Sequence, residues 1–281
     1  MSSILTNNGA MVALQTLKSI NMDLDKTQNA ISTGKEIATA KDGAAVWAIS
    51  KVMESDVSGF DAVSDALSLG ESTVAVASAA AEQIVNVLNE IKALAVSANS
   101  ENVDFAKVQA DIDERAAQVA SITAAAQFNG ANLLSDDVDG NGATSLSIVS
   151  SLDRVGSGNP TASTITVDTV DFVTNLDLVA DLTQITDTST AASALAEIEV
   201  FLQTAIDGAA ALGASAKRIE DQNGFVSKLM DAMTSGIGSL VDTNMEEASA
   251  KLQALQTQQQ LGVQALSIAN QAPQTILQLF R

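Results

Sequence analysis

The chain has 281 residues and a formal net charge of −20, and it contains no cysteine, histidine or tyrosine. The charge argues against nucleic acids and anionic membrane surfaces as partners, because both bind clustered Lys and Arg. Zinc, haem and iron–sulfur centres lack their usual thiol and imidazole ligands, and Cys–His and Ser–His–Asp catalysis is excluded. Hydrophobic residues make up 46% of the chain but aromatic ones only 3%, a composition that suits narrow helix–helix interfaces.

The N-terminal segment, residues 1–45, is predicted to form a helix followed by a linker. One helical face carries an apolar row of Leu17, Ile20, Leu24 and Ile31. The first lysine is Lys18, so the basic region of a cleaved signal peptide is missing. No apolar run reaches the roughly 20 residues that cross a bilayer. On these facts alone the protein would be expected in the cytoplasm.

Residues 46–134 are predicted to be the first half of a helical domain. Apolar residues alternate at spacings of three and four from Val46 to Ala98, and only Asp56 and Gly70 interrupt them. This pattern predicts a coiled-coil-like helix roughly 80 Å long. A second helix is predicted over 103–126, with Asn102 as its cap and an Asn-Gly turn after it.

Residues 135–190 differ from the rest of the chain. They hold nine acidic residues and one basic residue, Arg154. The segments 145–150 and 164–170 alternate polar and β-branched residues, as half-buried strands do. We expect a small, acidic, β-containing insertion that is exposed to solvent.

The C-terminal part repeats the helical pattern. Within residues 191–241, the three–four spacing runs from Leu195 to Leu240 with one polar position, Asn223, which predicts a fixed register. The apolar row then slips by one position, so a boundary is placed near Asp242. Residues 242–281 form a last predicted helix that has no ionisable side chain between Lys251 and Arg281. Such a helix could be buried among copies of the chain or docked on its own core, and the pattern alone does not choose.

Motifs that could support chemistry are incomplete. Around Gly34-Lys35, Asn29 and Glu36 occupy positions where a phosphate-binding loop needs Gly and Ser or Thr. Residues 137–142 resemble the start of a calcium loop, but Ile148 replaces its last ligand, so a polar turn is the favoured interpretation. The carboxylates at 111, 113 and 114 do not share one helical face and are interpreted as solvated. No enzyme activity and no cofactor are predicted.

Three segments resemble one known family. Residues 31–50 (ISTGKEIATAKDGAAVWAIS) resemble a bacterial flagellin segment in which a Ser-Gly turn leads to Ala-Lys-Asp and an Ala-Ile-Ser helix. Residues 127–134 (QFNGANLL) resemble its Phe-Asn-Gly element. The most specific match is the C-terminus, residues 260–281 (QLGVQALSIANQAPQTILQLFR). The resemblance covers about residues 1–134 and 191–281.

Resemblance to flagellins implies a mainly α fold of long antiparallel coiled-coil-like helices folded back on themselves, with the N- and C-terminal inner-core helices paired. It implies a homo-oligomeric filament for swimming motility, in which terminal helices that are disordered in the monomer fold during assembly. It also implies unfolded export, without a cleaved signal peptide, to the extracellular flagellum through a chaperone and the type III export apparatus, and contacts with filament cap and hook-junction proteins. This reverses the cytoplasmic expectation. The residues expected to mediate assembly are Leu14, Leu17, Leu24, Ile31, Leu252, Leu255, Leu266, Ile276, Leu277 and Phe280.

One segment departs from the family's pattern. Many flagellins carry an Arg before and a Gln after an Ile-Arg-Glu-Leu-Ala-Val core that a Toll-like innate receptor recognises. Residues 88–97 (LNEIKALAVS) place Glu90 at the position of the Arg and Ser97 at that of a Gln, with Leu94 between them. We expect weak receptor activation. Two other functions stay open, a hook–filament junction protein and a soluble binding module that displays the 135–190 insertion.

Overall fold

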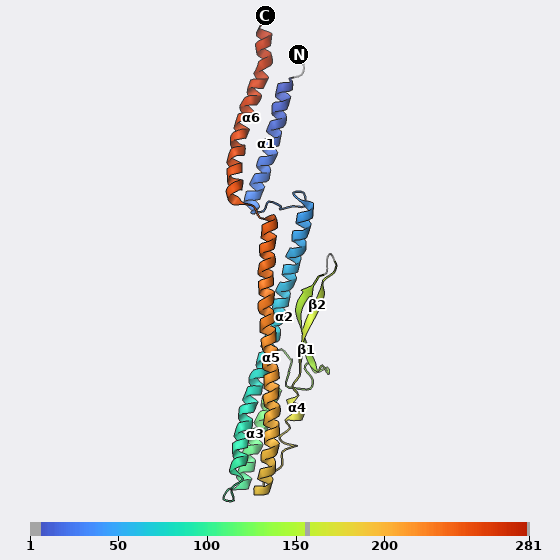
Figure 1. Ribbon diagram of the computed structural model, residues 1–281, viewed down its shortest axis with the longest axis vertical. Helices are drawn as coiled ribbons and strands as arrows, with labels where there is room; N and C mark the ends of the chain where they lie inside the picture. The colour runs from blue at the N-terminus through green and yellow to red at the C-terminus, as the bar shows by residue number, and fades with distance from the viewer. Residues whose placement is uncertain (1–6, 155–157, 280–281) are drawn as a thin grey trace. The chain divides into compact units, whose positions relative to one another are not determined.

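The computed structural model describes residues 7–154 and 158–279, with only the backbone described for 272–279. Long helices dominate this part of the chain, and a single antiparallel pair of strands accompanies them (Figure 1). The elements in chain order are α1 (Asn8–Thr33), α2 (Ala44–Ser97), α3 (Phe105–Ala125), β1 (Ser145–Asp153), β2 (Thr161–Asp168), α4 (Phe172–Asn175), α5 (Thr188–Val241) and α6 (Met245–Leu279). The predicted fold class is confirmed.

The chain divides into two compact units. The terminal unit comprises Met1–Ser55 and Ala232–Arg281, and the central unit comprises Asp56–Asp231. Both α2 and α5 contribute residues to each unit. The boundaries predicted from sequence, after residue 45 and near Asp242, lie at the start of α2 and just after the end of α5.

Within the terminal unit, the segment between α1 and α2 is held by polar contacts. The Lys35 ammonium lies 3.3 Å from the Glu54 carboxylate on α2, and the backbone N–H of Glu36 donates to the carbonyl of Val241 at 2.7 Å. Helix α5 ends at Val241, where the apolar row was predicted to slip. These contacts tie the linker to the end of α5.

The core of the central unit follows the predicted three–four spacing. From Leu67 on α2 to Ala98 just after it, every position of the apolar row is buried, including Gly70, which has no side chain. Large side chains that are fully buried come from α2, α3 and α5 and include Ile84, Leu88, Ile91, Ile112, Ile198, Leu212 and Ile219. The N-terminus of α3 differs from the prediction, since Asp104 accepts the capping hydrogen bond from the N–H of Lys107 and Asn102 does not.

The polar residue in the α5 row has specific partners on α2. The hydroxyl of Ser64 donates to the side-chain oxygen of Asn223 at 2.8 Å, and the amide nitrogen of Asn223 donates to the hydroxyl of Ser68 at 3.3 Å. These bonds satisfy a polar group inside an otherwise apolar interface, so only one alignment of α2 and α5 keeps them.

The β1–β2 hairpin packs on the helices of the central unit. The guanidinium of Arg154, at the end of β1, donates to the Asp56 carboxylate at 3.0 and 2.6 Å. A side chain at Gly70 would place its Cβ 2.8 Å from Cγ1 of Ile148, so this glycine leaves room for the strand. The two interruptions of the α2 row, Asp56 and Gly70, therefore both face the hairpin.

One face of this hairpin is buried against the rest of the central unit, as the alternation of polar and β-branched residues predicts for half-buried strands. Ile148, Ile165 and Val167 are buried, as are Phe172 of α4 and Ile185 before α5. The strands extend further at the hairpin end than predicted, over 145–153 and 161–168, with a bulge between Val149 and Ser151.

Candidate functional site

The residues expected to mediate assembly lie on α1 and α6, which pair in antiparallel fashion in the terminal unit (Figure 1). The Asn7 side chain donates to the carbonyl of Ala269 at 2.7 Å, and the Gln259 side chain donates to Asn21 at 2.7 Å. Between these two contacts, a Cβ added at Gly262 would lie 3.1 Å from the Leu17 side chain. Polar contacts at both ends and the packing of the Leu17 side chain against Gly262 thus fix how the two helices are aligned.

The inner face of the pair contains most of the predicted residues. Leu24 and Leu255 are buried, and Leu17, Ile31, Leu252 and Leu266 are half-buried. On α1, only Leu24 and Thr27 reach full burial among 26 residues. The intramolecular interface is therefore thin for helices of this length.

The outer face of the pair is also apolar. On α1, Met11 and Met22 lie eleven residues apart, which places them on one line along the helix. This line is opposite to the buried Leu24, and Leu14 lies beside it. On α6, Leu261 and Ile268 lie seven residues apart on the side opposite to the inner face. All five side chains are more than half exposed. Each helix therefore has two apolar faces, and only one of them is covered within the subunit.

The structure brings together Leu17, Leu24 and Ile31 of α1 with Leu252, Leu255 and Leu266 of α6 on the inner face, and it places Leu14 on the exposed side. Ile276 and Leu277 lie in the backbone-only part of α6, and Phe280 lies outside the described residues. Sequence reasoning missed Met11, Met22 and Ile268 because it followed one apolar row per helix. The eleven-residue spacing of the two methionines was the available signal.

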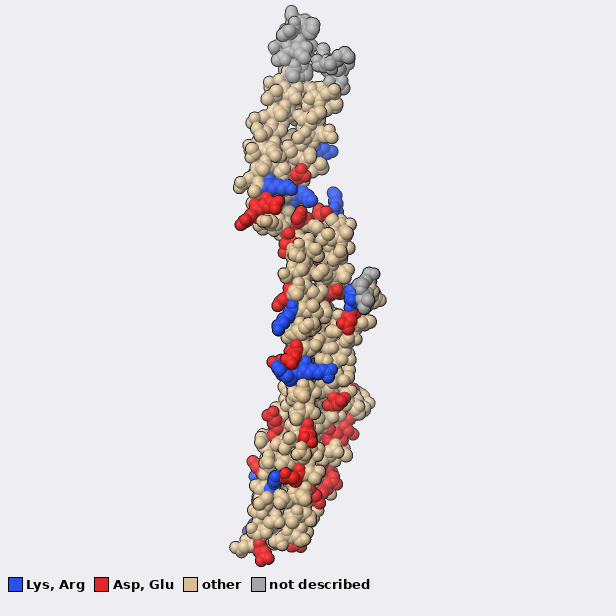
Figure 2. All heavy atoms as spheres, in the orientation of Figure 1, with Lys and Arg blue, Asp and Glu red and all other residues tan. Residues whose placement is uncertain are grey.

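Charge is distributed very unequally between the units. The central unit holds 26 of the 34 acidic residues and 7 of the 14 basic ones, which gives it a formal charge of −19 and leaves −1 for the terminal unit. On the face shown in Figure 2, the described part of the α1–α6 pair that adjoins the grey ends shows no charged side chain. Contacts between terminal units of two copies would thus meet little electrostatic repulsion.

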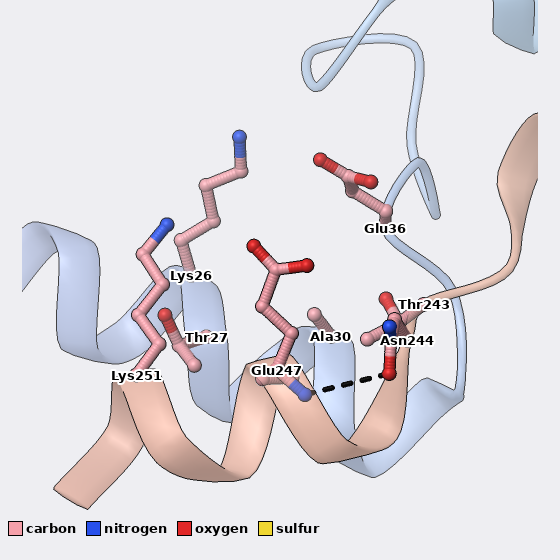
Figure 3. Close-up of a pocket in the computed structure, with 9 residues that line it drawn as sticks. Lys26, Thr27, Ala30, Glu36, Thr243, Asn244, Glu247 and Lys251 are labelled. Atoms are coloured by element: carbon pink, nitrogen blue, oxygen red, sulfur yellow. Dashed lines mark hydrogen bonds between the residues drawn. The ribbon is translucent and has the colours of Figure 1, made fainter.

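A pocket of about 130 Å³ lies between the last turns of α1 and the first turns of α6. Figure 3 shows its four charged side chains, Lys26, Glu36, Glu247 and Lys251, extending to the same side, and Asn244 accepting a hydrogen bond from the N–H of Glu247. Two lysines and two glutamates give no net charge. The pocket therefore lacks the positive charge of a phosphate site, and it has no cysteine or histidine to act as a nucleophile or base.

The calcium-like loop has the hydrogen bonds of a turn. Asp137 accepts from the N–H groups of Asp139 and Gly140, and Asp139 accepts from that of Asn141. The bond from Asn141 is the main cause of the lowered pKa of Asp139. Elsewhere, Asp111, Asp113 and Glu114 are exposed on α3, as expected of a solvated face. Among the residues described, no acidic cluster is arranged to hold a metal ion and no helix is long and apolar enough to cross a membrane.

The receptor-like segment lies near the end of α2. Glu90 is exposed and forms a salt bridge with Arg115 of α3. Leu94 is half-buried, and the exposed Ser97 donates its hydroxyl hydrogen to the Leu94 carbonyl at 2.7 Å. The exposed surface at this site is thus acidic at Glu90, although the charge is paired.

Comparisons with known proteins agree with these features. The family model for the bacterial flagellin N-terminal helical region matches residues 4–139, and that for the bacterial flagellin C-terminal helical region matches residues 195–280. The flagellin of Brucella melitensis is 42% identical, flagellin FljM of Caulobacter vibrioides 39% and flagellin C of Rhizobium meliloti 38%, and each alignment covers all of this chain and at least 99% of the relative. The chain therefore belongs to the bacterial flagellin family, and it is a structural subunit of the flagellar filament.

Proposed function

We propose that this subunit, which has no enzymatic role, assembles into the filament through the outer apolar faces of α1 and α6. The observation that carries the proposal is that both helices have a second face with exposed apolar side chains. On α6 this face has no charged residue after Lys251 within the described part of the helix, and on α1 Lys18 lies between Met11 and Met22. Apolar surface of this kind is stabilised when another helix covers it. In a homopolymer, the covering helices are the α1–α6 pairs of neighbouring copies.

The proposal includes folding of the terminal helices upon assembly. Ordering a residue costs about 1–2 kcal/mol of backbone entropy, and isolated helices need tertiary packing to be stable. Helix α1 buries only two of its 26 residues within the subunit, which offsets little of this cost. Contacts with neighbouring copies supply the remaining burial, so helix formation and assembly are coupled.

We also propose that the chain reaches the cell exterior unfolded. In this scheme an export chaperone and the type III export apparatus handle the chain, no signal peptide is cleaved, and filament cap and hook-junction proteins contact it at the filament ends. A chain without cysteine forms no disulfide that would block threading, and terminal helices with little intramolecular burial need little energy to unfold. Membership of the family of flagellar filament proteins supports the same route.

At the receptor-like segment, we propose weak recognition by the innate receptor. A receptor surface that binds an arginine at position 90 would meet the Glu90 carboxylate, and like charges at an interface cost several kcal/mol. The salt bridge to Arg115 neutralises part of this charge. Its guanidinium comes from α3, however, and does not replace an arginine at position 90 on α2.

The decisive experiment compares Ile268→Asp with Ile268→Met in the full-length protein, because Ile268 lies on the outer face of α6 and is 70% exposed in the subunit. In a filament the carboxylate would be buried without a partner between copies, whereas methionine preserves apolar volume. We expect the Asp variant to keep the circular dichroism of the central helices and to form no filaments by electron microscopy, and the Met variant to form them. Normal filaments from the Asp variant would refute the assembly model.

The same assay separates the two alternatives. A filament subunit forms long polymers from purified protein, whereas a hook–filament junction protein would stop at short assemblies. A binding module would remain a monomer, and its function would survive removal of residues 260–281. The full-length similarity to filament flagellins favours long polymers.

A further inference from the structure

Methionine is concentrated in the terminal unit and is most exposed on α1 and at the start of α6. Of the seven methionines, six belong to the terminal unit and only Met230 to the central unit. Met11, Met22 and Met245 are 56%, 58% and 46% exposed, whereas Met53, Met230 and Met233 are half-buried. The three exposed thioethers thus lie on the two helices that carry the proposed assembly surface.

We propose that Met11 and Met22 on the outer face of α1 form an oxidation-sensitive site, at which hydrogen peroxide converts the free subunit into a form that assembles poorly. Met245 is exposed as well, but it lies seven residues before Leu252 and so on the inner side of α6. The inference rests on the proposed function, because it takes α1 and α6 as the assembly surface. It adds a modification chemistry and a way in which the environment controls polymerisation.

The oxidation step is a two-electron transfer of one oxygen atom. The thioether sulfur attacks one oxygen of hydrogen peroxide, a sulfur–oxygen bond forms and the oxygen–oxygen bond breaks. The hydroxide that leaves takes up the proton from the transferred oxygen and becomes water, so sulfur is oxidised to the sulfoxide and peroxide is reduced. The chain has no cysteine to compete for the oxidant, and exposure then decides which methionines react first.

Oxidation at these positions changes the surface from apolar to polar. A sulfoxide is a polar, chiral group in place of a flexible apolar one, and it disrupts methionine-containing interfaces. At Met11 and Met22, assembly would bury this oxygen on a face that carries Leu14 and the exposed Lys18. The sulfoxide would exchange its hydrogen bonds to water for a largely apolar surrounding, which weakens the contact in every copy that carries it.

Peptide mass spectrometry of the full-length protein after graded peroxide treatment tests the first step. In free subunits we expect sulfoxide at Met11, Met22 and Met245 to form several-fold faster than at the half-buried methionines, which act as an internal control. In filaments the rates at the first two sites should fall. Equal rates at all sites in free subunits, or no protection in filaments, would overturn the proposal.

The second step is tested by the critical concentration for polymerisation, with each protein compared with its own untreated sample. Oxidation should raise this concentration about tenfold or more in the wild-type protein. A variant with Met11→Leu and Met22→Leu should show a treated-to-untreated ratio near one. A control with Met53→Leu, Met230→Leu and Met233→Leu should respond as the wild type does.

Repair gives a readout that does not depend on the variants. Methionine sulfoxide reductases MsrA and MsrB together reduce both sulfoxide epimers, so treatment of oxidised wild-type subunits should restore assembly. Oxidised subunits that polymerise normally, or an assembly defect that persists after complete repair, would overturn this inference alone. Failure of untreated wild-type protein to polymerise would instead refute the proposed function.

Discussion

Leu14 provides a sharp test of the exposed assembly face, because it lies outside the intramolecular interface and is 58% exposed. Burying a leucine side chain completely is worth about 1.5–3 kcal/mol. With just over half of its surface still to be buried, Leu14 should contribute about 1–2 kcal/mol to each subunit added to a filament. Leu14→Ala should therefore raise the critical concentration for polymerisation by about fivefold to thirtyfold.

Sedimentation of filaments over a range of protein concentrations measures this quantity. The matched control is Leu69→Ala, since Leu69 is 53% exposed on α2 in the central unit and belongs to no proposed assembly face. Both variants should unfold within about 0.5 kcal/mol of the wild type, as exposed substitutions usually do. Assembly of Leu14→Ala at the wild-type concentration, or an equal defect in both variants, would refute the reasoning.

Three further results are expected. Gly70→Ala should lower the thermal unfolding midpoint, because its Cβ would collide with the hairpin, whereas Gly224→Ala, which meets open space on α5, should raise it. A higher midpoint for Gly70→Ala than for Gly224→Ala would show that the hairpin does not lie against Gly70. The hydrogen bond from Lys51 lowers the pKa of Glu54, so the ionised carboxylate stabilises the folded state at neutral pH, and this stabilisation is lost as the pH falls through the folded-state pKa. Between pH 7 and about pH 3, which is below the usual glutamate pKa, the thermal unfolding midpoint of Glu54→Gln should therefore fall less than that of the wild type. Equal losses in the two proteins would contradict this. The wild-type chain should activate a Toll-like receptor reporter only weakly, and Glu90→Arg, which also breaks the salt bridge to Arg115, should increase the response. A wild-type potency equal to that of a strongly activating flagellin would refute weak recognition.

The long helices were predictable from sequence because their apolar rows persist over many turns. The interruptions were visible too, but their reasons were not. Asp56 and Gly70 contact a hairpin more than 70 residues further along the chain, and Asn223 bonds to serines on the other long helix. A periodic pattern records which residues share a face and carries no information about which distant segment covers it.

The candidate site was predictable on its inner face only. Leu24 and Leu255 belong to the predicted rows and are buried. Met11 and Met22 belong to a second row on the opposite face, which single-chain reasoning assigns to solvent. Their exposure becomes informative only when the structure shows that α6 covers the other side of α1.

The concentration of acidic residues in the central unit makes the salinity of the surrounding water a variable in filament growth. Each added copy brings a central unit with a formal charge of −19. In dilute fresh water at 0.01 M ionic strength the Debye length is about 30 Å, whereas at 0.15 M it is about 8 Å. Repulsion between charges on neighbouring copies therefore acts over about 30 Å in the dilute medium and over about 8 Å in the more saline one. Since the proposed apolar attraction of the terminal helices is largely independent of this screening, we expect purified subunits to polymerise at a lower concentration as the ionic strength rises.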